Sequence, residues 1–496
     1  MATKSLLFRA GVLLLSLSLL LSVFGCAMSE EDIADDNAAQ SGYGAEESEE
    51  TTKFDPTHTL PTDISYNGEK FTFLIRNESE SISDMAVEHL ADESSTMDKA
   101  VYARNMDVQD AYGVEFEFVT TTYDDFSRMV YNAVSGDPNL YDVIVGHGRT
   151  VFQGITQAYY ADWNELEYVD LSGEWWSQSA RQEWATPEGR IFAMNGDLSH
   201  MSIGNNSAMF FNKKVLANAG VTSPYQQVYD NNWTLDIFIQ TVKQIDGNLN
   251  HDETDSIDTD SFGYATERWR GPIYAAFCAG IGSFVKNEEG KYEIGLKNER
   301  IGSVTEKYID LVKNSGTSYF GSDLDRIRSA FKSERVVFTD DNVQCAVQFK
   351  GTGLDFGIVP FPKADQAAPY ASLVGSGTNT FAVIKTMSEE RLSRSSLILE
   401  ALACYGSRDV IPLYYETILS YQAMQDEHSL EMLRIIKNAG FFDLGHYTNY
   451  GQVGDLVRLL IEQPAKYGSS IHTAIQVVEQ SALSQLESWY SLDERY

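Results

Sequence analysis

The sequence contains few basic residues and lacks the short motifs that mark common catalytic sites. Its 496 residues include 37 Lys and Arg against 72 Asp and Glu, which gives a formal net charge of −35. Such a negative field repels nucleic-acid phosphates and anionic lipid surfaces, which argues against both as partners. No HExxH, GxSxG or P-loop motif occurs, and no GxGxxG follows a predicted strand. These absences favour a binding protein over an enzyme.

Cysteine is also scarce, and no two of the four cysteines are close in sequence. They are Cys26, Cys278, Cys345 and Cys404. Because no CxxC pair exists, the sequence contains no zinc or redox motif of that kind. The last three lie in apolar or mixed segments and are predicted to be buried thiols, with one disulfide among them as the alternative.

The N-terminus has the features of a bacterial lipoprotein signal. Lys4 and Arg9 precede a fifteen-residue apolar run, Ala10–Phe24. That run is too short to span a bilayer, which needs about 20 helical residues, but it suits a signal peptide. The segment Val23–Cys26 resembles a lipobox, with Phe24 bulkier than the usual small residue. We therefore expect residues 1–25 to be a lipoprotein signal peptide and Cys26 to carry the lipid. The alternative is a plain signal peptide with an incidental cysteine.

An acidic stretch follows the cysteine. Residues 27–61 hold ten acidic residues, one lysine and few large apolar side chains. Such a composition buries too little surface to fold, so we expect residues 26–64 to be a disordered tether. Because like charges repel, the tether would extend and hold the following domain away from the membrane. Two acyl chains on Cys26 would anchor the protein stably.

From about residue 65 the pattern predicts a folded α/β body. Strands are expected at 71–76, 114–120, 141–146, 335–340, 354–362 and 379–385, and a strand followed by a short helix at 207–221. Helices are expected at 97–113, 123–137 and 233–245, the last capped by Thr234, and residues 389–496 are expected to be mainly helical. The alternation of strand and helix predicts a parallel sheet, and the apolar strand 141–146 should be buried on both faces.

Several of these segments, in this order, resemble one protein family. The chain resembles the extracellular solute-binding proteins of bacterial ABC importers, in the branch that mostly carries sugars and oligosaccharides. The resemblance covers about residues 70–451, and it rests on the segments FTFLIR, YDVIVGHGRTVFQGITQAYYADWNEL, AMFFNKKVLANAGV, NWTLDIFIQTVKQI, LDFGIVPFPK and GSGTNTFAVIKTMSEE. It implies a two-lobed periplasmic-binding-protein-like fold, in which each lobe is a mainly parallel sheet flanked by helices and the ligand binds between the lobes.

The resemblance also implies an assignment of segments to lobes and a function. The first lobe would comprise residues 65–167 and 323–371, the second 171–321 and 380–496, with crossovers near 168–206, 322 and 372–379. The protein would be a monomeric receptor that passes a carbohydrate to a membrane permease, lipid-anchored on the outer face of a Gram-positive-type cell, where no periplasm retains it. The alternatives are a secreted carbohydrate-active enzyme or a surface adhesin.

Candidate ligand-binding residues follow from the rule that ligands of open α/β sheets bind at the carboxyl ends of strands. His147 and Arg149 follow the strand 141–146, and Asp340 ends the strand 335–340. The resemblance adds residues near the crossovers, namely Asp197, Ser376 and Asn379. The alternative for each is an ordinary loop or turn residue without contact to a ligand.

Aromatic residues complete the candidate site. Trp269 lies between Arg268 and Arg270, where the resemblance implies a platform on which a sugar ring stacks. The resemblance also places Tyr447 and Asn449 in a loop that closes the cleft. Trp233, by contrast, starts a predicted helix and is expected to pack in the core.

The acidic stretch 246–260 is a candidate calcium loop. Its oxygen-bearing residues are Asp246, Asn248, Asn250, Asp252, Asp258 and Asp260. Alternating Asp and Asn side chains are typical of such loops, but His251 replaces the usual glycine and Ile257 replaces the bidentate acid. The alternatives are therefore a structural calcium ion or a solvated acidic loop. No other cofactor is expected.

Overall fold

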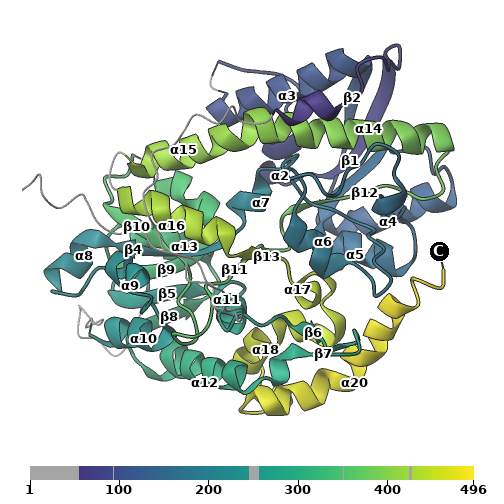
Figure 1. Cartoon of the computed structure of the whole chain (residues 1–496). Coiled ribbons are helices and arrows are strands. Elements are labelled where there is room, and N and C mark those ends of the chain that lie inside the picture. The colour runs from purple at the N-terminus through teal and green to yellow at the C-terminus, as the bar shows by residue number, and fades with distance from the viewer. Residues whose placement is uncertain (1–54, 93, 245–255, 350, 424–426, 496) are drawn as a thin grey trace, which may run out of the picture. The chain divides into compact units, whose positions relative to one another are not determined.

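The computed structural model describes residues 55–92, 94–244, 256–349, 351–423 and 427–495. Within them, two large β-sheets surrounded by helices form one body (Figure 1). Two further strand pairs are small: β6 (Phe284–Lys286) with β7 (Tyr292–Ile294), and β11 (Ser372–Leu373) with β13 (Gly440–Phe441). The predicted α/β class is confirmed.

The first sheet is mainly parallel, as predicted. Its strand order is β12-β3-β1-β2, with β1 at Glu69–Arg76, β2 at Val114–Thr121, β3 at Val143–His147 and β12 at Asn379–Ala382. Strands β2 and β3 both pair in parallel with β1, and β12 is antiparallel to β3. Four of the five residues of β3 are buried, which confirms that this apolar strand is covered on both faces.

The second sheet is mixed, which differs from the expectation of a mainly parallel sheet. Its order is β10-β4-β9-β5-β8, with β4 at Ser207–Asn212, β5 at Phe262–Glu267, β8 at Ser318–Gly321, β9 at Val336–Asn342 and β10 at Phe356–Val359. Strand β5 is parallel to β8 and β9, but β4 is antiparallel to both β9 and β10.

The pairing of the strands corrects the expected assignment of two segments to lobes. Residues 323–371 supply β9 and β10 to the second sheet, although they were expected in the first lobe. Conversely, β12 joins the first sheet, although it was expected in the second lobe. The helix that follows β12 stays with the first sheet, because its Arg394 forms a 2.7 Å ion pair with the buried Asp142 just before β3.

Helices account for most of the remaining chain, and Figure 1 labels most of the longer ones. Their bounds are α2 Ser79–Met85, α3 Thr96–Tyr112, α4 Tyr123–Ser135, α5 Gly148–Thr156, α6 Gln178–Trp184, α7 Met201–Gly204, α8 Lys213–Asn218, α9 Pro224–Tyr229, α10 Leu235–Lys243, α11 Gly271–Phe277, α12 Glu299–Asn314, α13 Leu324–Lys332, α14 Glu389–Tyr405, α15 Ile411–Ala423, α16 Glu427–Asn438, α17 Leu444–Thr448, α18 Leu456–Glu462, α19 Pro464–Tyr467 and α20 Ile471–Tyr490. Short turns are η1 Pro56–Thr59, η2 Trp163–Glu165, η3 Gly295–Lys297, η4 Val343–Phe349, the π-helical η5 Gly406–Val410 and η6 Tyr450–Asp455. The predicted helical C-terminal region is confirmed.

Local sequence signals explain where the predicted helices begin and end. Helix α3 starts with a capping box, in which Ser95 and Asp98 each accept the other's backbone N–H, and it ends at Gly113 with a φ of 59°. The Thr234 side chain caps α10 by accepting the Ile237 N–H, as predicted. Trp233 is buried and donates its indole N–H to the Pro360 carbonyl at 2.9 Å, which confirms its packing role.

The cysteines of the body are free thiols. Cys278, Cys345 and Cys404 are all buried, as predicted. Burial raises the pKa of the Cys278 thiol, so this side chain stays protonated at neutral pH. Across the part of the chain that the structure describes, no helix combines the length and apolar character needed to cross a bilayer.

Candidate functional site

A cavity of about 400 Å³ is lined by residues from both sheets. His147 and Arg149 reach it from the carboxyl end of β3, and Trp269 and Arg270 reach it from the carboxyl end of β5. The segment Gly375–Gly377, which leads into β12, forms a third part of the wall. Three other depressions have similar volumes, but this cavity lies at the strand ends where ligands of open α/β sheets bind.

His147 caps helix α5 and presents a neutral ring to the cavity. Its Nδ1 accepts the Arg149 backbone N–H at 3.1 Å, so the ring proton lies on Nε2, which can donate a hydrogen bond. Burial, together with the nearby charges of Arg76 and Arg149, lowers the pKa of His147 well below its usual value. The ring also contacts Tyr123 edge-on, with the centroids 5.1 Å apart.

Arg149 lines the cavity, but carboxylate and carbonyl oxygens hold its guanidinium. Nη1 and Nη2 bind the two carboxylate oxygens of Asp455 at 3.1 and 2.7 Å, and Nε donates to the His446 carbonyl at 3.2 Å. Burial raises the pKa of Asp455, but the hydrogen bond and charge of Arg149 outweigh this and hold it below its usual value. Arg149 therefore ties α5 to the start of α18 and keeps only part of its donor capacity for a ligand.

Trp269 is held at the cavity edge by an arginine. The Arg458 guanidinium lies 3.7 Å from the centre of the Trp269 ring, a close cation–π contact. Arg458 is fixed in turn by Glu462 at 2.6 Å on the same helix, α18. The Trp269 backbone N–H donates to Glu267 at 2.8 Å, and 46% of the residue remains exposed. An exposed indole with a fixed orientation suits stacking against a ligand ring.

Arg270 is charged and anchored by a buried carboxylate. Its Nε lies 3.3 Å from Asp341, which is 1% exposed and is also held by Arg328 at 2.8 and 3.1 Å. Burial lowers the pKa of Arg270, but Asp341 outweighs this and raises it above the usual value. From the sequence, Arg270 was expected only as a neighbour of Trp269, because no local signal distinguishes it from Arg268.

An amide cluster forms the next part of the wall. Asn205 accepts hydrogen bonds at Oδ1 from Asn342 at 2.9 Å and from Gln344 at 3.1 Å. Asn342 in turn accepts from the Tyr274 hydroxyl at 2.6 Å. Asn205, Asn342 and Tyr274 line the cavity and were not predicted. Asn342 lies two residues after the predicted Asp340 on the same strand, so the strand was identified but the residue was not.

The loop Gly375–Gly377 is held against α5 and α17. The Ser376 N–H donates to His446 Nε2 at 3.1 Å, and the Gly148 N–H donates to the Ser376 carbonyl at 2.8 Å. A side chain at position 148 would overlap the Tyr447 ring, so the close approach of these segments requires glycine there. The structure thus places the predicted Ser376 in the cavity wall, and it adds His446, whose pKa burial lowers to about 3.

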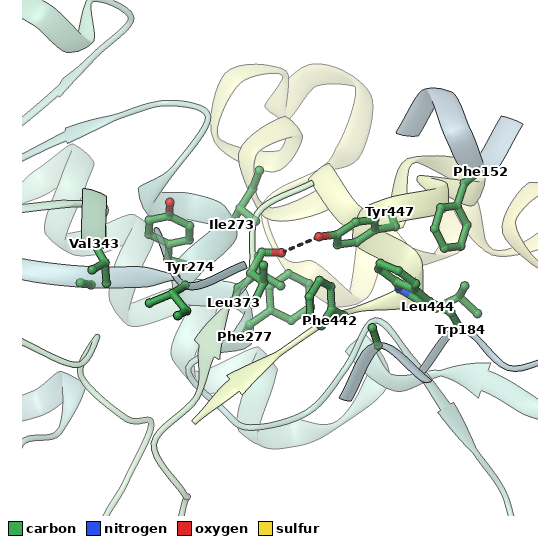
Figure 2. Packing of buried hydrophobic residues seen from close by; sticks show 14 of the residues in the cluster. Phe152, Trp184, Ile273, Tyr274, Phe277, Val343, Leu373, Phe442, Leu444 and Tyr447 are labelled. Carbon is green, nitrogen blue, oxygen red and sulfur yellow. Dashed lines mark hydrogen bonds between the residues drawn. The ribbon is translucent and has the colours of Figure 1, made fainter. Parts of the chain in front are cut away.

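Two predicted ligand-binding residues are buried instead. Asp340 is 1% exposed and accepts the Tyr264 hydroxyl at 2.6 Å inside the second sheet. Tyr447 donates to the Gly375 carbonyl at 3.2 Å, and Figure 2 shows it packed with Phe152 and Trp184. Neither residue lines the cavity. One polar atom of each side chain is thus bonded within the protein, namely Asp340 Oδ1 and the Tyr447 hydroxyl.

Asn379 belongs to a buried polar cluster that we call the crossover network: Asp84, Arg104, Ser199, His200 and Asn379. Asp84 accepts from Asn379 at 2.8 Å and from the His200 backbone N–H at 2.8 Å, and Ser199 also donates to it. Arg104 donates to the Leu198 carbonyl at 2.7 Å. Burial raises the pKa of Asp84, but His200 and the hydrogen bonds hold it below its usual value. The cluster joins α2, α3, the chain before α7 and β12.

Two further predicted residues lie outside the cavity lining. Asn449 is in the left-handed conformation, with φ of 51°, and donates to Asp455 at 3.2 Å. Asp197 lies beside Trp175, to whose carbonyl it donates its backbone N–H at 2.7 Å. Of the nine predicted ligand-binding residues, the cavity brings together His147, Arg149, Trp269 and Ser376.

Most of the candidate calcium loop lies outside the described residues, including Asp246, Asn248, Asn250 and Asp252. Of the other two, Asp258 pairs with Arg326, and Asp260 accepts the Ser256 N–H at 2.8 Å. Among the residues that the structure covers, no group of three His, Cys, Asp or Glu side chains could hold a metal ion. Calcium binding stays a prediction.

The cavity lies at the strand ends of the two sheets and has an aromatic edge and hydrogen-bonding walls. Solved structures of solute-binding proteins share this two-lobed fold. The ABC substrate-binding protein Lmo0181 from Listeria monocytogenes, in complex with cycloalternan, matches with a TM-score of 0.55 and 12% identity over 85% of this chain and 99% of that chain. No family model and no curated protein sequence match.

Two other structures extend the comparison. The maltose/maltodextrin-binding domain MalE from Bdellovibrio bacteriovorus, bound to maltotriose, has a TM-score of 0.55 and 14% identity over 84% of this chain and 100% of that one. UgpB from Mycobacterium tuberculosis, in complex with glycerophosphocholine, has a TM-score of 0.50 and 14% identity over 78% and 95%. At these identities the likeness establishes the fold.

Proposed function

We propose that this protein is the substrate-binding receptor of an ABC importer, and that it captures a carbohydrate in the cavity and delivers it unchanged to a membrane permease. The observation that carries the proposal is Trp269, an exposed indole held by Arg458 at the edge of a cavity at the strand ends. The apolar face of a sugar ring stacks on such a surface, while its hydroxyls bind polar groups of the wall.

The cavity wall also argues against the enzyme alternative. Glycoside hydrolysis requires two carboxylates at a defined separation across the scissile bond. Among the described residues that line the cavity, none is Asp or Glu. Asp341 and Asp455, which lie behind the wall, are buried and paired with arginines. Structural neighbours were solved with maltotriose and with the zwitterion glycerophosphocholine, so the fold accommodates solutes with and without charged groups.

The proposal includes the lipid anchor. Cys26 would carry two acyl chains, and the acidic segment that follows would hold the receptor near its permease as a monomer on the outer face of the membrane. Replacement of Cys26 by Ser should leave the protein soluble or uncleaved, whereas the wild type fractionates with membranes. Membrane retention of the mutant with a normal mature N-terminus would contradict the anchor and leave the receptor function untouched.

A ligand screen tests the receptor function. Thermal-shift measurements on residues 55–496 with a panel of mono- and oligosaccharides should identify a ligand that raises the melting temperature, since binding to the native state stabilises it. Small-angle scattering should then show a smaller radius of gyration with the ligand, because a ligand shifts the lobes only by binding the closed form better. Chromatography of the recovered ligand should show it intact. Cleaved products would overturn the proposal in favour of an enzyme.

A further inference from the structure

The cavity wall contains charged and neutral donors with unused capacity. In the described part of the chain, neither Nη atom of Arg270 makes a hydrogen bond, although the guanidinium is charged and anchored through Nε beside Asp341. His147 uses Nδ1 as an acceptor, which leaves Nε2–H as a donor in the wall. An arginine can present paired N–H groups to two oxygens at once, a geometry that matches carboxylate, sulfate and phosphate groups.

The acceptors of the same wall are largely occupied by protein donors. The carbonyl of Gly375 accepts from Tyr447 at 3.2 Å, and that of Ser376 accepts from Gly148 at 2.8 Å. The carbonyl of Gly377 accepts from the buried Arg76. The side-chain oxygens of the amide cluster are also occupied, as described above. The hydroxyls of Tyr123 and Ser376 can either donate or accept.

The side chains that most often accept hydrogen bonds from sugar hydroxyls are missing from the described lining. The chain has 72 acidic residues, yet none lines this cavity in the part of the protein that the structure describes. Each hydroxyl of an uncharged sugar also donates a hydrogen bond, and a donor that is buried without an acceptor weakens binding. An anionic group accepts hydrogen bonds without donating any, so it matches a wall of spare donors.

Resting on the proposed receptor function, we propose that the ligand is an acidic carbohydrate, whose carboxylate, sulfate or phosphate group binds Arg270 while its ring stacks on Trp269. The two residues are adjacent in sequence at the end of β5, so the charge and the stacking surface are presented together.

The experiment compares probes that differ in charge. Isothermal titration would use trigalacturonate and its fully methyl-esterified form, which keeps the sugar ring but removes the charge, with maltotriose as an uncharged trisaccharide. Glucose 6-phosphate and glucose 6-sulfate, each compared with glucose, test the phosphate and the sulfate group, as trigalacturonate tests the carboxylate. We expect at least one acidic probe to bind at least tenfold more tightly than its uncharged counterpart.

Variants of two neighbouring arginines test whether Arg270 causes the preference for acidic probes. Arg270→Gln should weaken binding of the acidic probe at least tenfold and leave an uncharged counterpart within about twofold. Arg268→Gln is the matched control, because Arg268 is 43% exposed in its side chain and lies outside the cavity lining. Because its guanidinium lies 5.7 Å from the centre of the Trp269 ring, Arg268→Gln should change the affinity for both probes equally and keep the preference for the acidic one. Urea unfolding of both variants checks that Arg270→Gln folds, since Arg328 still neutralises Asp341.

The outcomes separate this inference from the function on which it rests. If only uncharged saccharides bind, and Arg270→Gln binds them like the wild type, the receptor function stands and the acidic ligand is wrong. If folded protein binds no saccharide of either charge, both are wrong. Preference for an acidic probe that persists in Arg270→Gln would also overturn the assignment of the anion to Arg270.

Discussion

The cavity wall and the crossover network both contain arginine, histidine, asparagine and serine side chains but use them differently. In the crossover network, Asp84 receives several hydrogen bonds and Arg104 is 1% exposed, with its donors directed to protein oxygens. In the cavity wall, Arg270 is anchored through Nε beside Asp341, and its Nη atoms make no hydrogen bond within the part of the protein that the structure describes. A network whose members are all paired holds segments together, whereas spare capacity at an accessible surface is available to a ligand.

The two regions are also adjacent through a single short segment. Ser376 lies in the cavity wall, and Asn379, three residues later, lies in the crossover network. The segment through which the chain returns to the first sheet therefore forms part of both the cavity wall and the crossover network. This comparison predicts that substitutions in one region change stability and that substitutions in the other change binding.

The largest effect is expected from Asp84→Ala. The substitution removes the shared acceptor of Ser199, His200 and Asn379 and leaves Arg104 without its nearest buried carboxylate. Loss of one partner from a buried charged network costs about 3–5 kcal/mol of the free energy of unfolding, which urea denaturation would measure. The exposed Asp92→Ala is the control and should change stability by less than about 0.5 kcal/mol. Equal stability of the two variants would show that the network does not hold the crossovers.

For Trp269→Ala we expect a change in ligand binding and little change in stability. Loss of the stacking surface should weaken ligand binding by about 2–4 kcal/mol, as truncation of an interface hot spot does, with little change in stability because 46% of the residue is exposed. Isothermal titration with the tightest saccharide of the screen measures this. The control is Trp233→Ala, a buried tryptophan that should lose about 3–5 kcal/mol of stability. Unchanged affinity in folded Trp269→Ala would remove this residue from the site.

A smaller, pH-dependent effect is expected from Asp340→Asn. Burial raises the pKa of Asp340 to about 7, well above its value in an unfolded chain. The folded protein then binds more protons than the unfolded chain between about pH 4 and 7, so this group lowers stability as the pH rises through that window. The variant should be more stable than the wild type at pH 8, and similar to it below pH 4. If the free energy of unfolding depended on pH in the same way in both proteins, this would contradict burial of a titrating carboxyl at position 340.

The smallest effect concerns the acidic loop before β5, the strand that ends next to Trp269. If residues 246–260 hold calcium, addition of a chelator should lower the melting temperature of calcium-loaded protein, because an ion that binds only the folded chain stabilises it. We expect a loss of about 1–2 kcal/mol and no direct effect on the cavity. An unchanged melting temperature would identify a solvated acidic loop.

The fold was more predictable than the site, and the strands explain why. The segments around Phe73, Phe118 and Val145 were identified as strands because apolar side chains with period 2 or in a continuous run are a local signal. The partner of each strand is not local. Strand β9 pairs with β4 and β5, and β12 returns to β3, so residues expected in one lobe lie in the other.

For the site, position at a strand end was an incomplete guide. His147 and Asp340 both lie at the ends of predicted strands, but only His147 lines the cavity. Tyr264 covers Asp340 with a hydrogen bond, and α17 packs Tyr447 against Phe152 and Trp184. Arg270 lies next to the predicted Trp269 but was not predicted as a ligand-binding residue, because nothing in its local sequence distinguishes it from Arg268.

By itself, the sequence determined the elements, the α/β class, the caps of α3 and α10, and the aromatic and basic residues at the end of β5, because these depend on neighbours along the chain. The tertiary structure decided which polar side chains bind protein partners and which have donors available for a ligand. That distinction depends on partners hundreds of residues away, such as Asp455 for Arg149 and Asp84 for Asn379. A hydrogen bond requires its partner within about 3 Å, and only the folded chain brings such partners together.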